Sequence, residues 1–295
     1  MNSDNDILKK VRKIEIKTKG LSNQIFAGKY HSAFKGRGMS FSEVREYRIG
    51  DDVRDIDWNV TARTREPHIK TYEEERELTM MLLIDVSASR LFGSTDNLKK
   101  NIMTEIASIL AFSASQNNDK IGCIFYSDKI EKYIPAKKGR QHILLIIREL
   151  ISFTPTSKKT DIGVAIEFLT NVLKKRSTAF IISDFMDINP ITEKCNFESS
   201  LKIASKKHDI VGIKIYDKRE VSIPNVGIIE FNDAETGEKI WIDSSSAKVR
   251  NDYSAYWKKA SFIIDNTLMR YRVDSVSIST SEDYVKSLIK LFKQR

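Results

Sequence analysis

The stretch that most constrains the fold is residues 78–89, LTMMLLIDVSAS. Six of its first seven residues are apolar, which is typical of a strand covered on both faces in a parallel sheet. Asp85, Ser87 and Ser89 follow at its carboxyl end. Open α/β sheets bind ligands at the carboxyl ends of their strands. We therefore expect a central buried strand that delivers oxygen-bearing side chains to a binding edge.

Strand-like and helix-like segments alternate after this stretch, which predicts an α/β fold with a mostly parallel sheet and helices on both faces. Residues 129–135 are expected to add an antiparallel edge strand, and residues 227–245 to form a hairpin. Thr160 is expected to cap the helix that follows it. The other predicted strands are 121–127, 177–184, 210–217 and 274–280, and the predicted helices are 97–116, 139–153, 161–175, 193–208, 246–272 and 281–295.

The first part of the chain differs in pattern from the rest. Apolar spacing predicts a helix within residues 5–26, and residues 28–76 predict a β-rich extension that packs on the main domain. We therefore divide the chain into residues 1–76 and 77–295. Trp58 is expected to be buried as an anchor of the extension. Asp51 and Asp52 are expected to pair with arginines or to cap backbone amides.

Composition narrows the class of protein. The chain has 295 residues, a net charge of +9 and two cysteines, and no apolar run approaches the roughly 18 residues of a membrane span. Its first residues lack the apolar core of a signal peptide, so a cytoplasmic location is expected. A moderately basic solvated surface explains the net charge better than nucleic-acid binding, because the sequence carries no base-reading module.

Three parts of the predicted sheet edge bring hydroxyls and carboxylates together: Asp85 with Ser87 and Ser89, then Thr160, then Asp184. Hard oxygen donors of this kind favour Mg²⁺, with Mn²⁺ or Ca²⁺ as alternatives, over zinc. A different interpretation is purely structural. In that interpretation the two serines cap the next turn and Asp85 pairs with a basic residue.

These residues carry a resemblance to a known family. DVSAS at 85–89, Thr160 and the ISD that ends at Asp184 resemble the metal-ion-dependent adhesion site (MIDAS) of von Willebrand factor A domains. Residues 36–77 are similar to the hallmark of the bacterial DUF58 family. The resemblance implies a von Willebrand A-like doubly wound domain that works with MoxR-type AAA+ ATPases. It also implies that Asp85, Ser87, Ser89, Thr160 and Asp184 are the metal ligands.

The leading functional hypothesis is a non-enzymatic, metal-dependent protein-interaction module. The partner is expected to be a MoxR-type AAA+ ATPase or another protein that offers an acidic residue to the metal. The chain has no P-loop motif, so ATP hydrolysis is assigned to the partner. The alternative is a metal-dependent phosphohydrolase that uses Asp85 as phosphoryl acceptor. Ser87 disfavours this alternative, because it stands where such enzymes place a general acid.

Overall fold

The computed structural model describes residues 9–18, 20–21, 40–73, 78–93, 98–232, 237 and 239–295. The chain divides into two compact units, which are taken separately below. The larger unit is Met1–Ala33 with Thr79–Arg295, and the smaller unit is Phe34–Leu78. The expected packing of residues 28–76 on the main domain stays a prediction.

The larger unit is built on a six-stranded sheet in the order β12-β9-β6-β3-β4-β5. All neighbouring strands are parallel except β4 and β5, which are antiparallel. β3 lies between β4 and β6, so the prediction of a central first strand is confirmed. The strands are β3 (Thr79–Asp85), β4 (Lys120–Tyr126), β5 (Ile130–Lys137), β6 (Thr178–Ser183), β9 (Asp209–Tyr216) and β12 (Asp274–Ser279).

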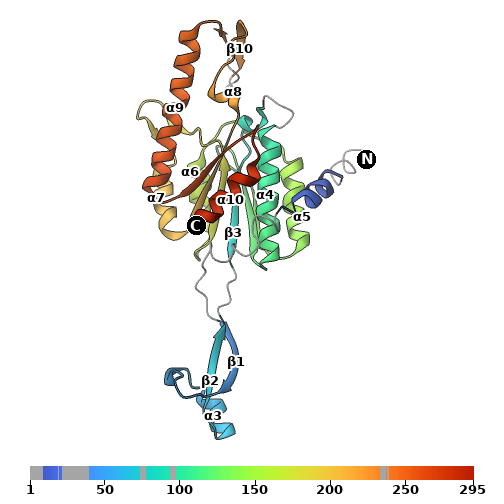
Figure 1. The fold of residues 1–295 in the computed structure, drawn as a ribbon, viewed down its shortest axis with the longest axis vertical. Coiled ribbons are helices and arrows are strands. Elements are labelled where there is room, and N and C mark those ends of the chain that lie inside the picture. The colour runs from blue at the N-terminus through green and yellow to red at the C-terminus, as the bar shows by residue number, and fades with distance from the viewer. Residues whose placement is uncertain are drawn as a thin grey trace. The chain divides into compact units, whose positions relative to one another are not determined.

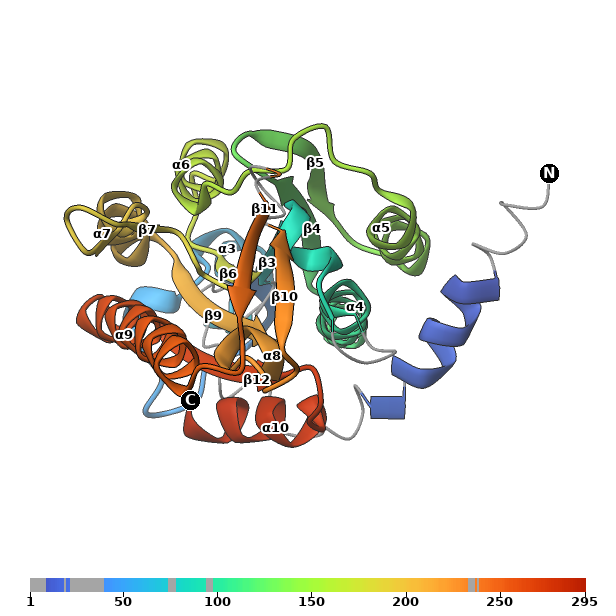
Figure 2. The same ribbon diagram turned by 90° about the horizontal axis from the view of Figure 1, so that it is seen from above.

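Helices cover both faces of this sheet, which explains why β3 and β6 are buried along nearly their whole length. Figure 2 shows α6, α7 and α9 on one face and α4, α5 and α10 on the other. Every residue of β6 is buried, and so are six of the seven residues of β3. The helices are α4 (Lys99–Gln116), α5 (Arg140–Ser152), α6 (Ile162–Val172), α7 (Glu198–Lys207), α9 (Ala247–Arg270) and α10 (Tyr284–Gln294). The predicted doubly wound α/β fold is confirmed.

A hairpin interrupts the alternation, as predicted. Strands β10 (Ile228–Asn232) and β11 (Lys239–Asp243) pair antiparallel after the short helix α8 (Lys218–Val221). Figure 1 shows this part of the chain beside the first half of α9, where Phe231 packs against Tyr253 with ring centroids 5.6 Å apart. A second small pair, β7 (Ile188–Asn189) with β8 (Lys194–Cys195), precedes α7. The helix predicted from residue 193 therefore begins only at Glu198.

The smaller unit is an antiparallel ribbon of β1 (Ser40–Glu46) and β2 (His68–Glu73). The connection between them holds a 3₁₀ turn, η1 (Val53–Asp55), and a helix, α3 (Trp58–Thr64). The β-rich expectation missed this helix. Its sequence signal was Asp57, whose carboxylate accepts from the amides of Asn59 (2.9 Å) and Val60 (3.2 Å) and caps the first turn.

The acids of this unit behave as expected. Asp51 accepts two hydrogen bonds from the Arg45 guanidinium, at 2.8 and 2.9 Å, and Asp52 accepts from the amide of Arg54 at 2.9 Å. The prediction that Trp58 is buried is wrong, because its side chain is 68% exposed. The reason is local: α3 buries none of its residues, so it offers no apolar layer for an indole to enter.

The N-terminal helix is confirmed over residues 9–18, while parts of the predicted range 5–26 lie outside the described residues. Lys17 on this helix pairs with Glu105 of α4 at 2.7 Å. Within the part of the chain that the structure describes, no helix is both long enough and apolar enough to cross a membrane.

Candidate metal centre

The candidate site lies at the switch point of the sheet. Counted along the chain, the six strands have the order 3-2-1-4-5-6, so β3 and β6 are the neighbours where the strand order reverses. Doubly wound sheets bind ligands in the crevice outside the carboxyl ends of these two strands. Asp85 is the last residue of β3, and Asp184 directly follows β6. The fold therefore delivers both predicted carboxylates to this crevice.

The loop after β3 forms a tight turn that brings the side-chain oxygen atoms of Asp85, Ser87 and Ser89 together. Asp85 is 1% exposed, and its Oδ1 accepts from the Ser87 amide at 2.9 Å. The hydroxyls of Ser87 and Ser89 lie 3.1 Å apart. Ser87 precedes the 3₁₀ turn η2 (Ala88–Leu91), but its side chain makes no capping hydrogen bond. Asp85 forms no ion pair with the described residues, so the structural interpretation of this loop is wrong on both points.

The environment of Asp85 disfavours its charge. Burial, followed by the neighbouring charge of Asp184, raises the pKa of Asp85 from 3.8 to about 6. Hydrogen bonds oppose this rise, the shortest being the one that the Ser183 hydroxyl donates to Asp85 Oδ2 at 2.7 Å. The two carboxylates therefore repel each other at one buried edge of the sheet.

Asp184 has a cation of its own. Lys99, the first residue of α4, donates to Asp184 Oδ2 at 3.0 Å, and its side chain is only 2% exposed. The same ammonium forms an ion pair with Glu220 of α8. Burial alone raises the pKa of Asp184, but the charge of Lys99 and the amide of Met186 outweigh it, so the pKa of Asp184 is lowered. A hydrogen bond with the Ser89 hydroxyl acts in the same direction.

Thr160 lies in the loop before α6, half-buried. The Ala88 amide donates to the Lys158 carbonyl at 3.0 Å and holds this loop beside the β3 turn. The Asp161 amide donates to the Ser127 carbonyl at 3.0 Å and fixes the loop to the end of β4. The predicted capping role of Thr160 is wrong, because the side chain that caps α6 is Asp161, which accepts from the Val164 amide at 3.1 Å. The structure thus links four of the five predicted residues directly and fixes the loop of the fifth next to them.

Sequence reasoning missed three residues of the site: Ser183, Lys99 and Glu220. Ser183 had a signal, since it directly precedes Asp184. Lys99 had a weaker one. A lysine in the first turn of a helix opposes the helix dipole, so its presence there suggests a nearby acid. The side chain of Glu220 is held by a capping box at the start of α8, where its carboxylate accepts from the Asp217 amide at 2.9 Å.

Cationic side chains lie close to this edge of the sheet. Arg90 is 5% exposed and donates to the Phe153 carbonyl at 2.8 Å. Burial lowers the pKa of Arg90, and the charge of Asp85 partly restores it. Lys158 and Lys159 in the Thr160 loop are exposed. An approaching group therefore meets positive charge at the loops that surround the two acids.

The donor set fits a hard divalent cation. Two carboxylates and two hydroxyls are oxygen ligands of the kind that Mg²⁺ takes, with coordination completed by water or by another carboxylate. Among the described residues, no cluster of three or more histidine, cysteine, aspartate or glutamate side chains could hold a metal. A cation between Asp85 and Asp184 would remove the repulsion that raises the pKa of Asp85.

The fold and these oxygen donors define an α/β domain with a candidate divalent-cation centre at the switch point of its sheet. The chain belongs to the family described as "Protein of unknown function DUF58", which matches residues 43–261. This range includes all five predicted ligands and most of the stretch that carried the resemblance. The family prediction is confirmed.

The chain is also similar to individual proteins. The "Uncharacterized protein Mb1516" of Mycobacterium bovis is 29% identical over 289 residues, which cover 97% of this chain and 88% of that protein. An aerotolerance-related membrane protein from Bacteroides fragilis is similar in structure, with a TM-score of 0.50 and 15% identity, over 74% of this chain and 100% of that chain. The SpRpn10 VWA domain has a TM-score of 0.37 and 15% identity, over 74% and 95%. At these identities the structural likeness concerns the fold alone.

Proposed function

We propose that the chain is a non-enzymatic interaction module that binds a divalent cation, preferably Mg²⁺, at Asp85, Ser87, Ser89, Thr160 and Asp184. The observation that carries the proposal is the meeting of the two acids and the serine hydroxyls at the switch point. When bound, the cation supplies a coordination position for an acidic side chain of a partner protein. The partner's carboxylate brings negative charge that neutral hydroxyls lack.

The charges around the site support an acidic partner. Arg90, Lys158 and Lys159 lie on the loops that approach the two acids, so a carboxylate entering there is attracted rather than repelled. The partner that we propose is a MoxR-type AAA+ ATPase, on the strength of the family resemblance. The absence of a P-loop from the sequence assigns ATP hydrolysis to that partner. The cytoplasmic location stays a prediction.

The phosphohydrolase alternative is less well supported. A phosphoryl acceptor must be open to attack on a phosphate ester, but the side chain of Asp85 is almost fully buried. Ser87 stands where a general acid would be required, and a hydroxyl protonates a leaving group poorly.

The first experiment measures Mg²⁺ binding by isothermal titration calorimetry, with Mn²⁺ detected by electron paramagnetic resonance as a second probe. We expect Asp85→Asn to weaken binding at least tenfold. Asp283→Asn is the matched control, because Asp283 undergoes the same chemical change at the cap of α10, where its carboxylate accepts from the Val285 amide at 3.0 Å. Equal binding by both variants and the wild type would refute the metal site.

The second experiment tests the adaptor role separately. A purified MoxR-type AAA+ ATPase is incubated with the immobilised wild-type protein in Mg²⁺ or in chelator, and with the Asp85→Asn variant in Mg²⁺. Capture is expected only for the wild type in Mg²⁺. Capture that ignores chelator and substitution would contradict metal-dependent docking, while metal binding without any capture would contradict the choice of partner.

A further inference from the structure

A basic hollow lies at the opposite, amino-terminal edge of the sheet. Its volume is about 510 Å³, and it is lined by residues that precede β6, β9 and β12 and by one side of α7. Five cations line it: Arg176 before β6, Lys202 and Lys206 on α7, Arg270 at the end of α9 and Arg272 before β12. Arg270 is paired with Glu198, so we refer to Arg176, Lys202, Lys206 and Arg272 as the cations of the basic hollow. No part of the candidate metal centre contributes to it.

The four cations lack acidic partners in the described part of the chain. Asp209 also lines the hollow, but it is paired with Arg295, and Glu198 is paired with Arg270 at 2.7 Å. Arg176, Lys202, Lys206 and Arg272 are all exposed and form no ion pair there. Grouped like charges without counter-ions raise the local concentration of anions.

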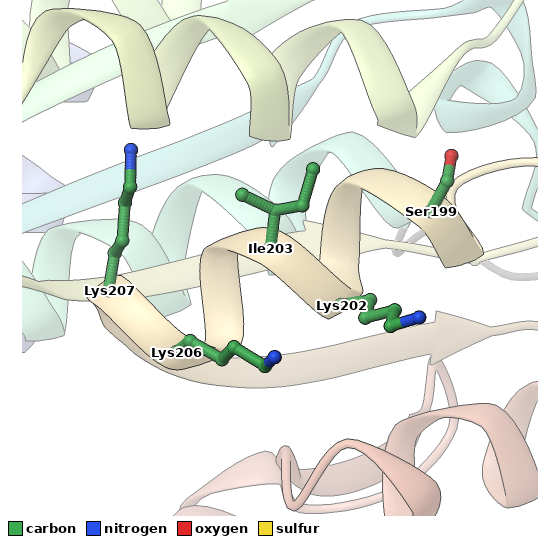
Figure 3. A pocket seen from close by; sticks show the side chains of 5 residues that line it. All are labelled: Ser199, Lys202, Ile203, Lys206 and Lys207. Carbon is green, nitrogen blue, oxygen red and sulfur yellow. The ribbon is translucent and has the colours of Figure 1, made fainter.

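Figure 3 shows how α7 presents its two lysines. Lys202 and Lys206 project from one side of the helix, whereas Ile203 and Lys207 project from another side. These four side chains and Ser199 line an adjoining hollow of about 440 Å³. Lys202 and Lys206, four residues apart, line both hollows and therefore act as one pair on one helix face.

The backbone holds Arg272 at the hollow in an unusual conformation. Arg272 has φ +55°, in the left-handed region. Its amide donates to the Met269 carbonyl at 3.0 Å, and the Val273 amide to the Leu268 carbonyl at 2.9 Å, which is the Schellman ending of α9. Glycine or asparagine is preferred at this position, and Asn118 takes the equivalent place at the end of α4. The end of α9 has an arginine instead.

A buried histidine forms part of the same hollow. His208 is 3% exposed, and its Nδ1 shares a hydrogen bond of 3.0 Å with the Ser177 hydroxyl. Its Nε2 is buried and has no partner among the described residues. Burial, with the charges of Lys207 and Arg176, lowers the pKa of His208. A bound anion would offset those charges and would offer an acceptor near a group that lacks one.

We propose that the basic hollow binds a small phosphate-bearing molecule with more than one negative charge, such as a pyrophosphate or a nucleotide. Two guanidinium groups suit paired phosphate oxygens, and two ammonium groups add charge without fixing geometry. The volume matches a small-molecule site. The cations also converge on one hollow instead of forming the extended stripe that follows a nucleic-acid backbone.

At this edge α7 and α9 do not attract an anion through their helix dipoles, so the cationic side chains must supply the attraction. α7 ends at Lys207 and α9 at Arg270, so both helices turn their carbonyl ends, with partial negative charge, toward this edge. Backbone amides of the kind that bind phosphate at helix N-termini are therefore not presented by these helices. Removal of the lysine charges should therefore weaken binding strongly, although the two arginines remain.

The test is a calorimetric titration of the full chain with pyrophosphate at constant ionic strength. We expect saturable one-to-one binding that weakens at least tenfold in Lys202→Ala/Lys206→Ala. The matched control is Lys248→Ala/Lys286→Ala, which removes the same charge from exposed positions on α9 and α10 and should bind like the wild type. Circular dichroism of both variants checks that they are folded.

Three results would overturn the proposal. One is the absence of saturable binding of pyrophosphate and of ATP. Another is an equal loss in the control variant, which would reduce the effect to net charge. The third is hollow-dependent binding of a single-stranded oligonucleotide at least tenfold tighter than pyrophosphate, which would make nucleic acid the ligand. Repeating the titration in chelator separates this site from the metal centre, because the metal-centre proposal can fail without changing pyrophosphate binding.

Discussion

The two edges of the sheet differ in the burial and the pairing of their charged side chains. At the carboxyl edge the charged groups are buried and closely partnered: Asp184 and Glu220 share Lys99, and Asp85 accepts hydrogen bonds from Ser183 and Ser87. At the amino edge the cations of the basic hollow are exposed and form no ion pair with the described residues. Buried charges are costly to keep, whereas exposed ones cost little. The contrast predicts that substitutions at the two edges affect different measurements: stability at one, anion binding at the other.

The largest expected effect is at Lys99. Lys99→Met leaves Asp184 and Glu220 in a buried place without their shared cation, so the free energy of unfolding should fall by about 3–5 kcal/mol. Urea unfolding in chelator, followed by circular dichroism, measures this. Lys202→Met is the control at the other edge, where the change should stay within about 0.5 kcal/mol. Equal effects at the two positions would remove the contrast.

Asp85 should give the next largest effect, and its sign depends on pH. Its pKa of about 6 in the fold exceeds its ordinary value of 3.8, so the folded state binds more protons between these values. In chelator the contribution of Asp85 to stability is therefore largest below pH 4 and is lost as pH rises through 6, by roughly 1–3 kcal/mol.

Substitution removes this dependence. Asp85→Asn in chelator should be more stable than the wild type at pH 7 and should show a flatter profile between pH 4 and 6. Thermal unfolding across this range provides the comparison. If the wild type and Asp85→Asn showed the same change of stability with pH, the folded state would not raise the pKa of Asp85, and the prediction would be wrong.

Glu220 should give a smaller effect, which tests how much each of the two ion pairs of Lys99 contributes to stability. Glu220→Gln keeps the hydrogen bond to the Asp217 amide but removes one negative charge from Lys99. We expect a loss of roughly 1–2 kcal/mol, smaller than that of Lys99→Met, because Asp184 keeps its cation. A loss as large as that of Lys99→Met would show that Glu220 is the main partner of Lys99.

The smallest effect is expected at Trp58. Because its side chain is 68% exposed, Trp58→Ala should change the free energy of unfolding by no more than about 0.5 kcal/mol. The burial expected from the sequence would have predicted several times more. Denaturant unfolding of this variant therefore separates an exposed indole from one that a neighbouring surface covers.

Much of the sheet could be predicted because the apolar composition of its central strands indicates that they are buried. Six of the seven residues 78–84 are apolar, and residues 179–182 form an unbroken apolar run, which is typical of strands covered on both faces. The position of Asp85 and Asp184 followed, since parallel strands end at one edge. Lys99 could not be placed in this way, because its two acids are 85 and 121 residues away along the chain and meet it only after folding.

The burial of Trp58 was predicted wrongly for a different reason. An aromatic residue between charged ones normally indicates an anchor, but a two-stranded ribbon with one short helix has too little apolar surface to bury it. The capping acids of the same stretch were predictable, because an aspartate bonds to amides two or three residues on and needs no tertiary partner.

The placement of the three tryptophans has an optical consequence. Trp58 is the one tryptophan of Phe34–Leu78, whereas Trp241 and Trp257 belong to the larger unit. Trp257 packs against Tyr216 with ring centroids 5.5 Å apart, and Trp241 is 67% exposed. With selective excitation of tryptophan, a Trp241→Phe/Trp257→Phe protein would therefore fluoresce from Phe34–Leu78 alone. Its emission maximum and its quenching by iodide would report directly on whatever covers the indole of Trp58, including a partner added to the cuvette.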